Sequence, residues 1–83
     1  MEVVLHPHAL DRLRERGVTV EEATATVLGG EHISAKYGRV GFRRNFSYGR
    51  LWRGKLYAMK QIEAYAIEEA GHWVVITVIA RYF

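Results

Sequence analysis

Three side chains near the start of the chain have types and spacing suited to chemistry on a phosphate group. The segment HPHALDRLRERG, residues 6–17, places His8, Arg12 and Arg16 at spacing i, i+4 and i+8. In a helix, residues four apart are neighbours, so these three side chains would share one stripe. An imidazole exchanges protons near neutral pH, and guanidinium groups stay charged and match phosphate oxygens. The spacing therefore predicts proton transfer and phosphate binding from one helix.

A purely structural interpretation of this segment stands beside the chemical one. Arginines at the border of an amphipathic helix cover apolar neighbours with their methylene groups and keep their guanidinium groups in water. We assign that role to Arg14. For the stripe of His8, Arg12 and Arg16, both interpretations stay open on this segment alone.

A basic stretch without acidic residues runs from Ser34 to Lys60. It holds eight of the twelve basic residues of a chain whose formal net charge is +3. Cations bind phosphates, and rings between them can stack the unpaired bases of single-stranded RNA. Rings that pack across strands would explain the aromatic residues equally well, but not the exclusion of Asp and Glu. We therefore predict an RNA-binding face made of Lys36, Arg39, Arg43, Arg44, Arg50, Trp52, Arg53, Lys55 and Tyr57.

Other kinds of chemistry have little support in the sequence. The chain has no cysteine, which excludes a disulfide scaffold, a Cys-based zinc site and a thiol nucleophile. His6 and His8 form the only close histidine pair, without a His-x-x-x-His motif. Ser34 and Ser47 lie in no nucleophile-elbow setting. We expect neither a metal ion nor a cofactor.

Metal-free cleavage of RNA fits the remaining residues. The 2′-hydroxyl attacks its own phosphate in this reaction, and one proton-transfer group with several cations suffices. His8 is the predicted proton-transfer residue, Thr77 would orient a phosphate oxygen, and Arg44 would assist in phosphate binding. The predicted catalytic set is His8, Arg12, Arg16, Lys60 and Thr77.

Two helices are predicted to precede a sheet and to position these side chains. The 83 residues, 49% of them hydrophobic, suffice for one domain with a two-layer core. Pro7 and Gly17 bracket the first helix, and the spacing of Thr19 and Glu22 predicts a capping box for a second that ends at residues 29–30. Alternating apolar residues and glycine turns predict strands near 32–37, 40–48, 55–68 and 72–82. We expect an α+β fold with two N-terminal helices packed on a four-stranded antiparallel β-meander.

Side-chain alternation places two of the catalytic candidates on these strands. Lys60 falls on an apolar face with Leu56 and Ile62, so we expect it partly desolvated at the floor of a cleft. Thr77 has the same parity as Val75 and would project from an otherwise packed strand.

The same composition bears on where the protein acts. The apolar runs are too short to span a bilayer, and no basic segment followed by an apolar one opens the chain. With no cysteine, nothing contradicts a reducing compartment. We expect a cytoplasmic protein that does not bind membranes.

Four motifs in a fixed order carry a family resemblance. They are H-A-x-x-R-x-x-x-R-G at residues 8–17, a capped helix that ends in Gly-Gly, G-K-L-Y at 54–57 and V-V-I-T-V at 74–78. Together they resemble the prokaryotic family called domain of unknown function 4258, over nearly the whole chain. That family is grouped with the superfold of barnase, colicin D, colicin E5 and RelE-like ribonuclease toxins. The resemblance implies one RNase-toxin-like domain over residues 1–83, with His8, Arg12, Arg16 and Thr77 as motif positions.

The sequence thus leads to one hypothesis and two alternatives. The hypothesis is a small metal-independent endoribonuclease, toxin-like or RNA-processing, that acts on RNA and is held in check by an antitoxin or another regulatory protein. The first alternative is a non-catalytic module that binds single-stranded RNA. The second is a protein-interaction domain whose basic strip docks an acidic partner.

Overall fold

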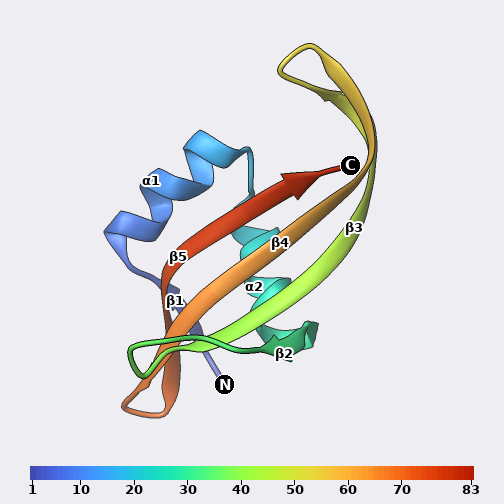
Figure 1. The fold of residues 1–83 in the computed structure, drawn as a ribbon. Coiled ribbons are helices and arrows are strands. Elements are labelled where there is room, and N and C mark those ends of the chain that lie inside the picture. The colour runs from blue at the N-terminus through green and yellow to red at the C-terminus, as the bar shows by residue number, and fades with distance from the viewer.

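The computed structural model describes residues 1–83 as two helices and one five-stranded sheet (Figure 1). In chain order the elements are β1 (Val3–Leu5), α1 (Pro7–Arg16), α2 (Val20–Gly29), β2 (Glu31–Ile33), β3 (Val40–Trp52), β4 (Lys55–Glu69) and β5 (His72–Tyr82). The strand order is β1-β5-β4-β3-β2, with β1 parallel to β5 and all other neighbours antiparallel. The α+β class predicted from the sequence is confirmed.

The prediction of a four-stranded antiparallel meander is wrong, because the sheet is mixed and has five strands. The missed strand, β1, is only three residues long and too short to show alternation. It is defined by its partner β5, with Val3 opposite Trp73 and Leu5 opposite Val75. A pairing between the two ends of a chain leaves no local signal in the sequence.

Both helices begin and end where the sequence predicts. The Nδ1 atom of His6 caps α1 by accepting a hydrogen bond from the His8 N–H at 3.1 Å, and Gly17 ends the helix with φ 68°. At α2 the capping box is complete. The Glu22 N–H donates to the Thr19 hydroxyl at 3.0 Å, and the Thr19 N–H donates to the Glu22 carboxylate at 2.9 Å.

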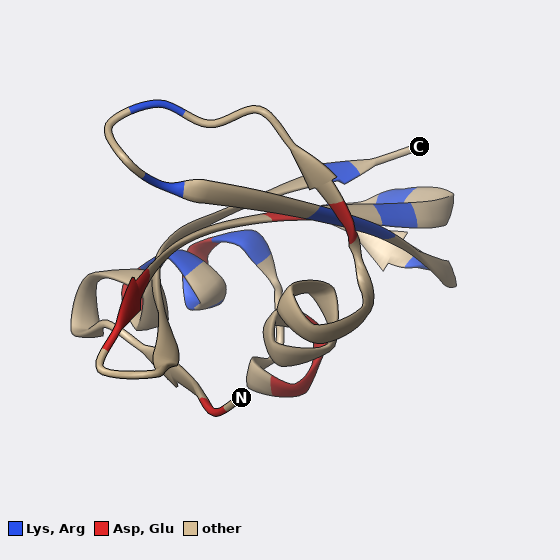
Figure 2. Ribbon diagram, turned by 90° about the horizontal axis from the view of Figure 1, so that it is seen from below, with Lys and Arg blue, Asp and Glu red and all other residues tan.

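The two helices cover one face of the sheet, and the segment between β2 and β3 lies over the other (Figure 2). Helix α1 packs on β5, and α2 packs on β3 and β4. Apolar side chains from both layers meet between them and form a single core. Its buried members are Ala9, Leu13, Val18, Ala23, Val27, Phe42, Ile62, Ala64, Ala66, Val75 and Val78.

A β-bulge in β5 reverses the predicted placement of Thr77. The register against β4 shifts between the Tyr65–Thr77 pair and the Ala66–Val75 pair, so β5 carries one extra residue there. Val75 and Val78 are both fully buried against the helices. Since neighbouring residues alternate between faces, Thr77 faces the opposite side from Val78. The prediction that Thr77 and Val75 share a face is therefore wrong.

The β3–β4 hairpin extends past the helices and curves at its far end (Figure 1). Two residues with positive φ, Arg53 at 50° and Gly54 at 83°, form its two-residue turn, as right-twisted hairpins require. The predicted apolar face of β4 is buried only beneath the helices. Ile62 is fully buried, whereas Leu56, near the turn, is 67% exposed.

Candidate functional site

The predicted stripe on α1 exists, but its three side chains do not converge. His8 is exposed, and no hydrogen bond engages its imidazole. Arg12 pairs with Glu15 on the same helix at 3.0 Å, while Arg16 turns to the sheet and donates to the Val78 carbonyl. His8 and Arg16 are separated by about 12 Å along the axis, at a rise of 1.5 Å per residue. Because Arg16 is engaged with the Val78 carbonyl, the stripe does not form a preorganised site that joins His8 to Arg16.

Lys60 is buried inside the domain rather than at the floor of a cleft, contrary to the sequence-based prediction. Its side chain is 2% exposed, and its ammonium donates to the Gly17 carbonyl and, at 2.8 Å, to the Glu22 carboxylate. Burial alone would raise the pKa of Glu22, but hydrogen bonds from Lys60 and Thr19 outweigh it and hold the pKa below its ordinary value. Lys60 thus joins the end of α1 to the start of α2.

Thr77 lies on the other face of the sheet, away from α1. It lines a pocket of about 250 Å³ between the β2–β3 segment and strands β4 and β5. We call this the loop pocket, and its lining residues are Lys36, Tyr37, Arg39, Tyr65, Thr77 and Ile79. The predicted catalytic set is therefore divided among the α1 stripe, the interior and the loop pocket.

A cluster of four aromatic rings occupies the far end of the molecule. The Tyr82 ring stacks on Trp52 with centroids 4.7 Å apart and planes at 15°. Tyr48 and Tyr57 approach Tyr82 at 5.2 and 5.8 Å. Burial, helped by the charges of Tyr48 and Glu22, raises the pKa of Tyr82 to about 12, so its hydroxyl stays protonated and donates to the Arg16 carbonyl at 2.6 Å.

Each outer ring of this cluster carries a cation from the same hairpin. Arg50 lies over Tyr48 at 4.8 Å, Arg53 lies over Trp52 at 5.0 Å, and Lys55 lies over Tyr57 at 5.5 Å from the ring centroid. All three cations are exposed, and the three rings are partly exposed. We call these six residues the hairpin-end surface. They include five of the nine predicted RNA-binding residues, namely Arg50, Trp52, Arg53, Lys55 and Tyr57.

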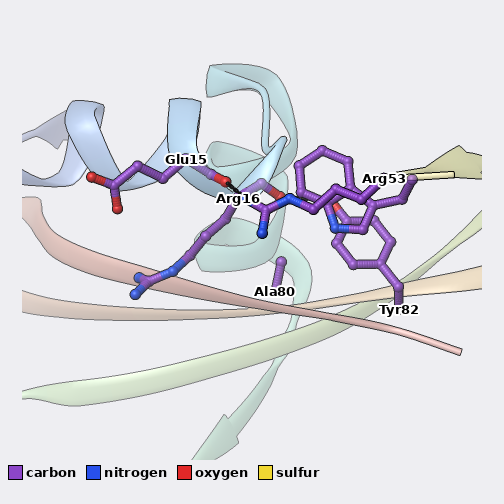
Figure 3. A pocket seen from close by; sticks show the side chains of 6 residues that line it. Glu15, Arg16, Arg53, Ala80 and Tyr82 are labelled. Carbon is purple, nitrogen blue, oxygen red and sulfur yellow. Dashed lines mark hydrogen bonds between the residues drawn. The ribbon is translucent and has the colours of Figure 1, made fainter.

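A shallow pocket of about 130 Å³ joins the hairpin-end surface to the end of α1 (Figure 3). Arg53 crosses it and donates to the Glu15 backbone carbonyl at 2.9 Å, while the Glu15 carboxylate points away (Figure 3). Arg16 enters from the helix side. Arg16 and Arg53 both line this pocket, but the Arg16 guanidinium extends away from Arg53 (Figure 3), and the chain's own carbonyls already occupy donors on each side chain.

The other four predicted RNA-binding residues lie elsewhere. Arg43 pairs with Glu31 at 2.7 Å, and Arg44 donates to the Ala25 carbonyl at 3.2 Å. These two are neighbours on one strand and so point to opposite faces of the sheet. Lys36 and Arg39 belong to the loop pocket. The acid-free stretch of sequence is therefore not one continuous face.

Three titratable residues outside the basic stretch also shape these surfaces, and sequence reasoning missed them as site residues. Tyr82 is the centre of the aromatic cluster, yet it lies outside the basic stretch. Tyr65 and Glu63 lie below the loop pocket, where the Tyr65 hydroxyl donates to Glu63 at 2.6 Å, and this hydrogen bond raises the pKa of Tyr65. The alternation of β4 and β5 could have indicated all three, because each faces a pocket or ring cluster from a paired strand.

The fold and these surfaces define a small two-layer α+β domain with a mixed sheet and a basic, aromatic hairpin end. Residues 5–80 match the family model described as Domain of unknown function (DUF4258), and the chain belongs to this family. No curated protein and no solved structure gives a significant match. Neither helix has the length and apolar character needed to cross a membrane.

Proposed function

We propose that this protein binds single-stranded RNA through the hairpin-end surface. The observation that carries the proposal is the pairing of each outer ring, Tyr48, Trp52 and Tyr57, with a cation of its own hairpin. Rings take up unpaired bases, and cations neutralise the phosphates between them. A surface of this composition is suited to a flexible strand and not to a rigid duplex.

Binding would exchange one set of ring contacts for another. An exposed cation over a ring is worth about 0.5–1 kcal/mol, whereas a base stacked on an aromatic side chain is worth about 1–3 kcal/mol. A base can therefore displace Arg50 or Lys55 from its ring, and the freed cation can turn to a phosphate. The exposure of these two cations permits this movement, whereas Arg53 is also held by its hydrogen bond to the Glu15 carbonyl.

Salt dependence of binding tests the proposal with a matched control. We expect the double variant Arg50→Gln/Lys55→Gln to weaken binding of a labelled single-stranded oligonucleotide and to flatten the slope of log K against log salt by about one to two units. Arg14→Gln is the control, because Arg14 is an exposed arginine of α1 with no ion pair or side-chain hydrogen bond. The double variant removes two charges and Arg14→Gln removes one, so the effects are compared per charge. An equal effect per charge would reduce the interaction to net charge and refute the proposed surface.

Metal-independent endoribonuclease activity is the second candidate, and its site would be the α1 stripe. The observation that favours it is the free imidazole of His8, which is exposed on the same helix as Arg12 and Arg16. We expect wild-type protein to cleave RNA in the presence of EDTA and His8→Ala to lower the rate by about 10²-fold or more. This site consists of the α1 stripe alone and does not include Lys60 or Thr77.

A denaturing gel of total RNA decides between the two functions. His32→Ala is the control for His8→Ala, because the His32 ring packs on Phe42 at 4.8 Å and lies outside the stripe. If wild-type protein leaves RNA intact while still binding it, the function reduces to RNA binding. If it neither binds nor cleaves RNA, the basic surface serves an acidic partner protein, such as an antitoxin.

A further inference from the structure

The loop pocket is a second site, on the face of the sheet that the helices leave open (Figure 2). We propose that it binds a nucleoside phosphate, with the base on Tyr37 and the phosphate between Lys36 and Arg39. This site is separate from the hairpin-end surface, and the proposal does not depend on RNA binding there. The ligand would be either a free mononucleotide or the phosphorylated end of an RNA strand.

Tyr37 has an unfavourable positive φ, and its side chain makes no contact within the fold that compensates for this cost. Its φ is 63°, and Gly38 follows with 71°, in a turn closed by a 3.2 Å hydrogen bond from the Arg39 N–H to the Lys36 carbonyl. A large side chain at positive φ costs about 1 kcal/mol or more. The Tyr37 side chain is 87% exposed and pairs with no other ring. The turn therefore holds an unpartnered aromatic ring at the mouth of the pocket.

The other two residues with positive φ show why Tyr37 is different. Arg53 and Ala70 occupy two-residue turns between paired strands, where hairpin geometry requires that conformation. Tyr37 is the fourth of the six residues that connect β2 to β3, and a connection of that length does not impose a positive φ as a two-residue turn does. The base of a bound ligand, stacked on the exposed ring of Tyr37, would supply the aromatic contact that this ring lacks within the chain.

The cations of the loop pocket are free to bind an anion. Neither the Lys36 ammonium nor the Arg39 guanidinium takes part in an ion pair or a side-chain hydrogen bond. By contrast, each of the six basic side chains on the strands has a carbonyl, carboxylate or ring partner. Two unpaired cations beside a pocket favour an anionic ligand, and a phosphate can use donors from both.

Two hydroxyl groups of the loop pocket, those of Tyr65 and Thr77, provide one hydrogen-bond acceptor and one donor for a ligand. The Tyr65 hydroxyl donates a hydrogen bond to one carboxylate oxygen of Glu63, and the other oxygen of Glu63 accepts from Arg81. The hydroxyl oxygen of Tyr65 therefore remains free to accept a hydrogen bond from a ligand in the pocket. The Thr77 hydroxyl takes part in none of the side-chain hydrogen bonds of the chain and can donate. A ligand with phosphate oxygens and a ribose hydroxyl would satisfy both, while Ile79 gives an apolar contact. A nucleoside phosphate has all these groups.

Amide shifts in an NMR titration of the full chain test this proposal. The probes are adenosine 5′-monophosphate, adenosine, inorganic phosphate, and a short oligonucleotide with and without a 5′-phosphate. We expect the nucleotide to shift amides of the loop pocket and to bind about tenfold tighter than inorganic phosphate, because stacking adds about that factor. Shifts of the loop-pocket amides that are produced by the 5′-phosphorylated strand, at lower concentration than by the mononucleotide, and not by the same strand without its phosphate identify an RNA end as the source of the ligand.

Variants at the turn separate this site from the hairpin-end surface. Tyr37→Asn removes the ring but suits positive φ, and it should weaken nucleotide binding about tenfold, whereas Tyr37→Phe should retain it. Arg39→Gln should weaken binding of both nucleotide and phosphate. Arg50→Gln/Lys55→Gln should leave nucleotide binding unchanged. The absence of shifts at the loop pocket with every phosphorylated probe, or shifts that survive both Tyr37→Asn and Arg39→Gln, would overturn the proposal.

Discussion

The hairpin end and the loop pocket are both basic, but their cations differ in how far the fold itself uses them. Near the hairpin end, Arg16 and Arg53 donate to backbone carbonyls, and Lys60 donates to a carbonyl and a carboxylate. At the loop pocket, Lys36 and Arg39 have neither kind of partner. Arg16, Arg53 and Lys60 therefore stabilise the domain through hydrogen bonds, whereas Lys36 and Arg39 remain available to a ligand. At the hairpin end only Arg50 and Lys55, which lie over rings and make no hydrogen bond, are available in the same way.

This difference follows from where each region lies in the fold. The hairpin curves back over the end of α1, so its cations meet carbonyls that the helix leaves without partners. The loop lies over a sheet face that no helix covers, so its cations meet water. Measurements of stability and binding on matched variants can test this distinction.

The largest effect is expected at Lys60. Lys60→Met keeps the length of the side chain but leaves the partly buried Glu22 carboxylate without its cation. Loss of one partner of a buried ion pair costs about 3–5 kcal/mol, and we expect the free energy of unfolding in urea to fall by that order. Lys60 is also 5.5 Å from the Tyr48 ring, so the hairpin end should loosen with it.

The double variant Lys60→Met/Glu22→Gln is the control for this prediction. With no unpaired charge left inside, it should recover a large part of the lost stability, because the cost lies mainly in the uncompensated carboxylate. If the double variant is as unstable as Lys60→Met alone, packing of the lysine stem and its bond to Gly17 carry the effect instead.

Local signals in the sequence predict the helices well, and the reason is physical. Pro7, Gly17 and the Thr19–Glu22 capping box act within a few residues of themselves, and all of them function as the sequence predicts. The α+β class follows from the same local patterns. Strand β1 does not, because it depends on pairing with residues about seventy positions away.

The candidate site was harder to predict, because alternation along a strand fails at a bulge. One extra residue in β5 moves Thr77 from the helix side to the open face, far from the α1 stripe. Composition identified the basic stretch, but it could not show that Arg43 and Arg44 point to opposite faces or that Lys60 is enclosed. The groups that these basic side chains contact within the chain are known only from the packing of the helices on the sheet.

A smaller effect is expected from acid, and it also depends on Glu22. The pKa of this carboxyl in the folded state lies below its ordinary value of 4.5, so its contribution to stability is fully present above that value and is lost as the pH falls through the folded-state pKa. Other carboxyls also titrate in this range, so the comparison is with Glu22→Gln, which keeps the cap. We expect the difference in Tm between wild type and Glu22→Gln to be largest near neutral pH and to narrow below pH 4.5. A difference that stays constant across this range would show that the carboxylate charge contributes nothing.

The smallest effect on stability is expected where the cations have no partners. We expect Lys36→Gln/Arg39→Gln to change the free energy of unfolding by less than about 0.5 kcal/mol, as for surface substitutions that break no interaction. Arg53→Gln alone should cost about 1 kcal/mol, because it loses the hydrogen bond to the Glu15 carbonyl and the contact with Trp52. Urea denaturation of the three proteins, side by side, measures both values. If the loop double variant proves the less stable one, its cations serve the fold after all, and the contrast between the two basic regions disappears.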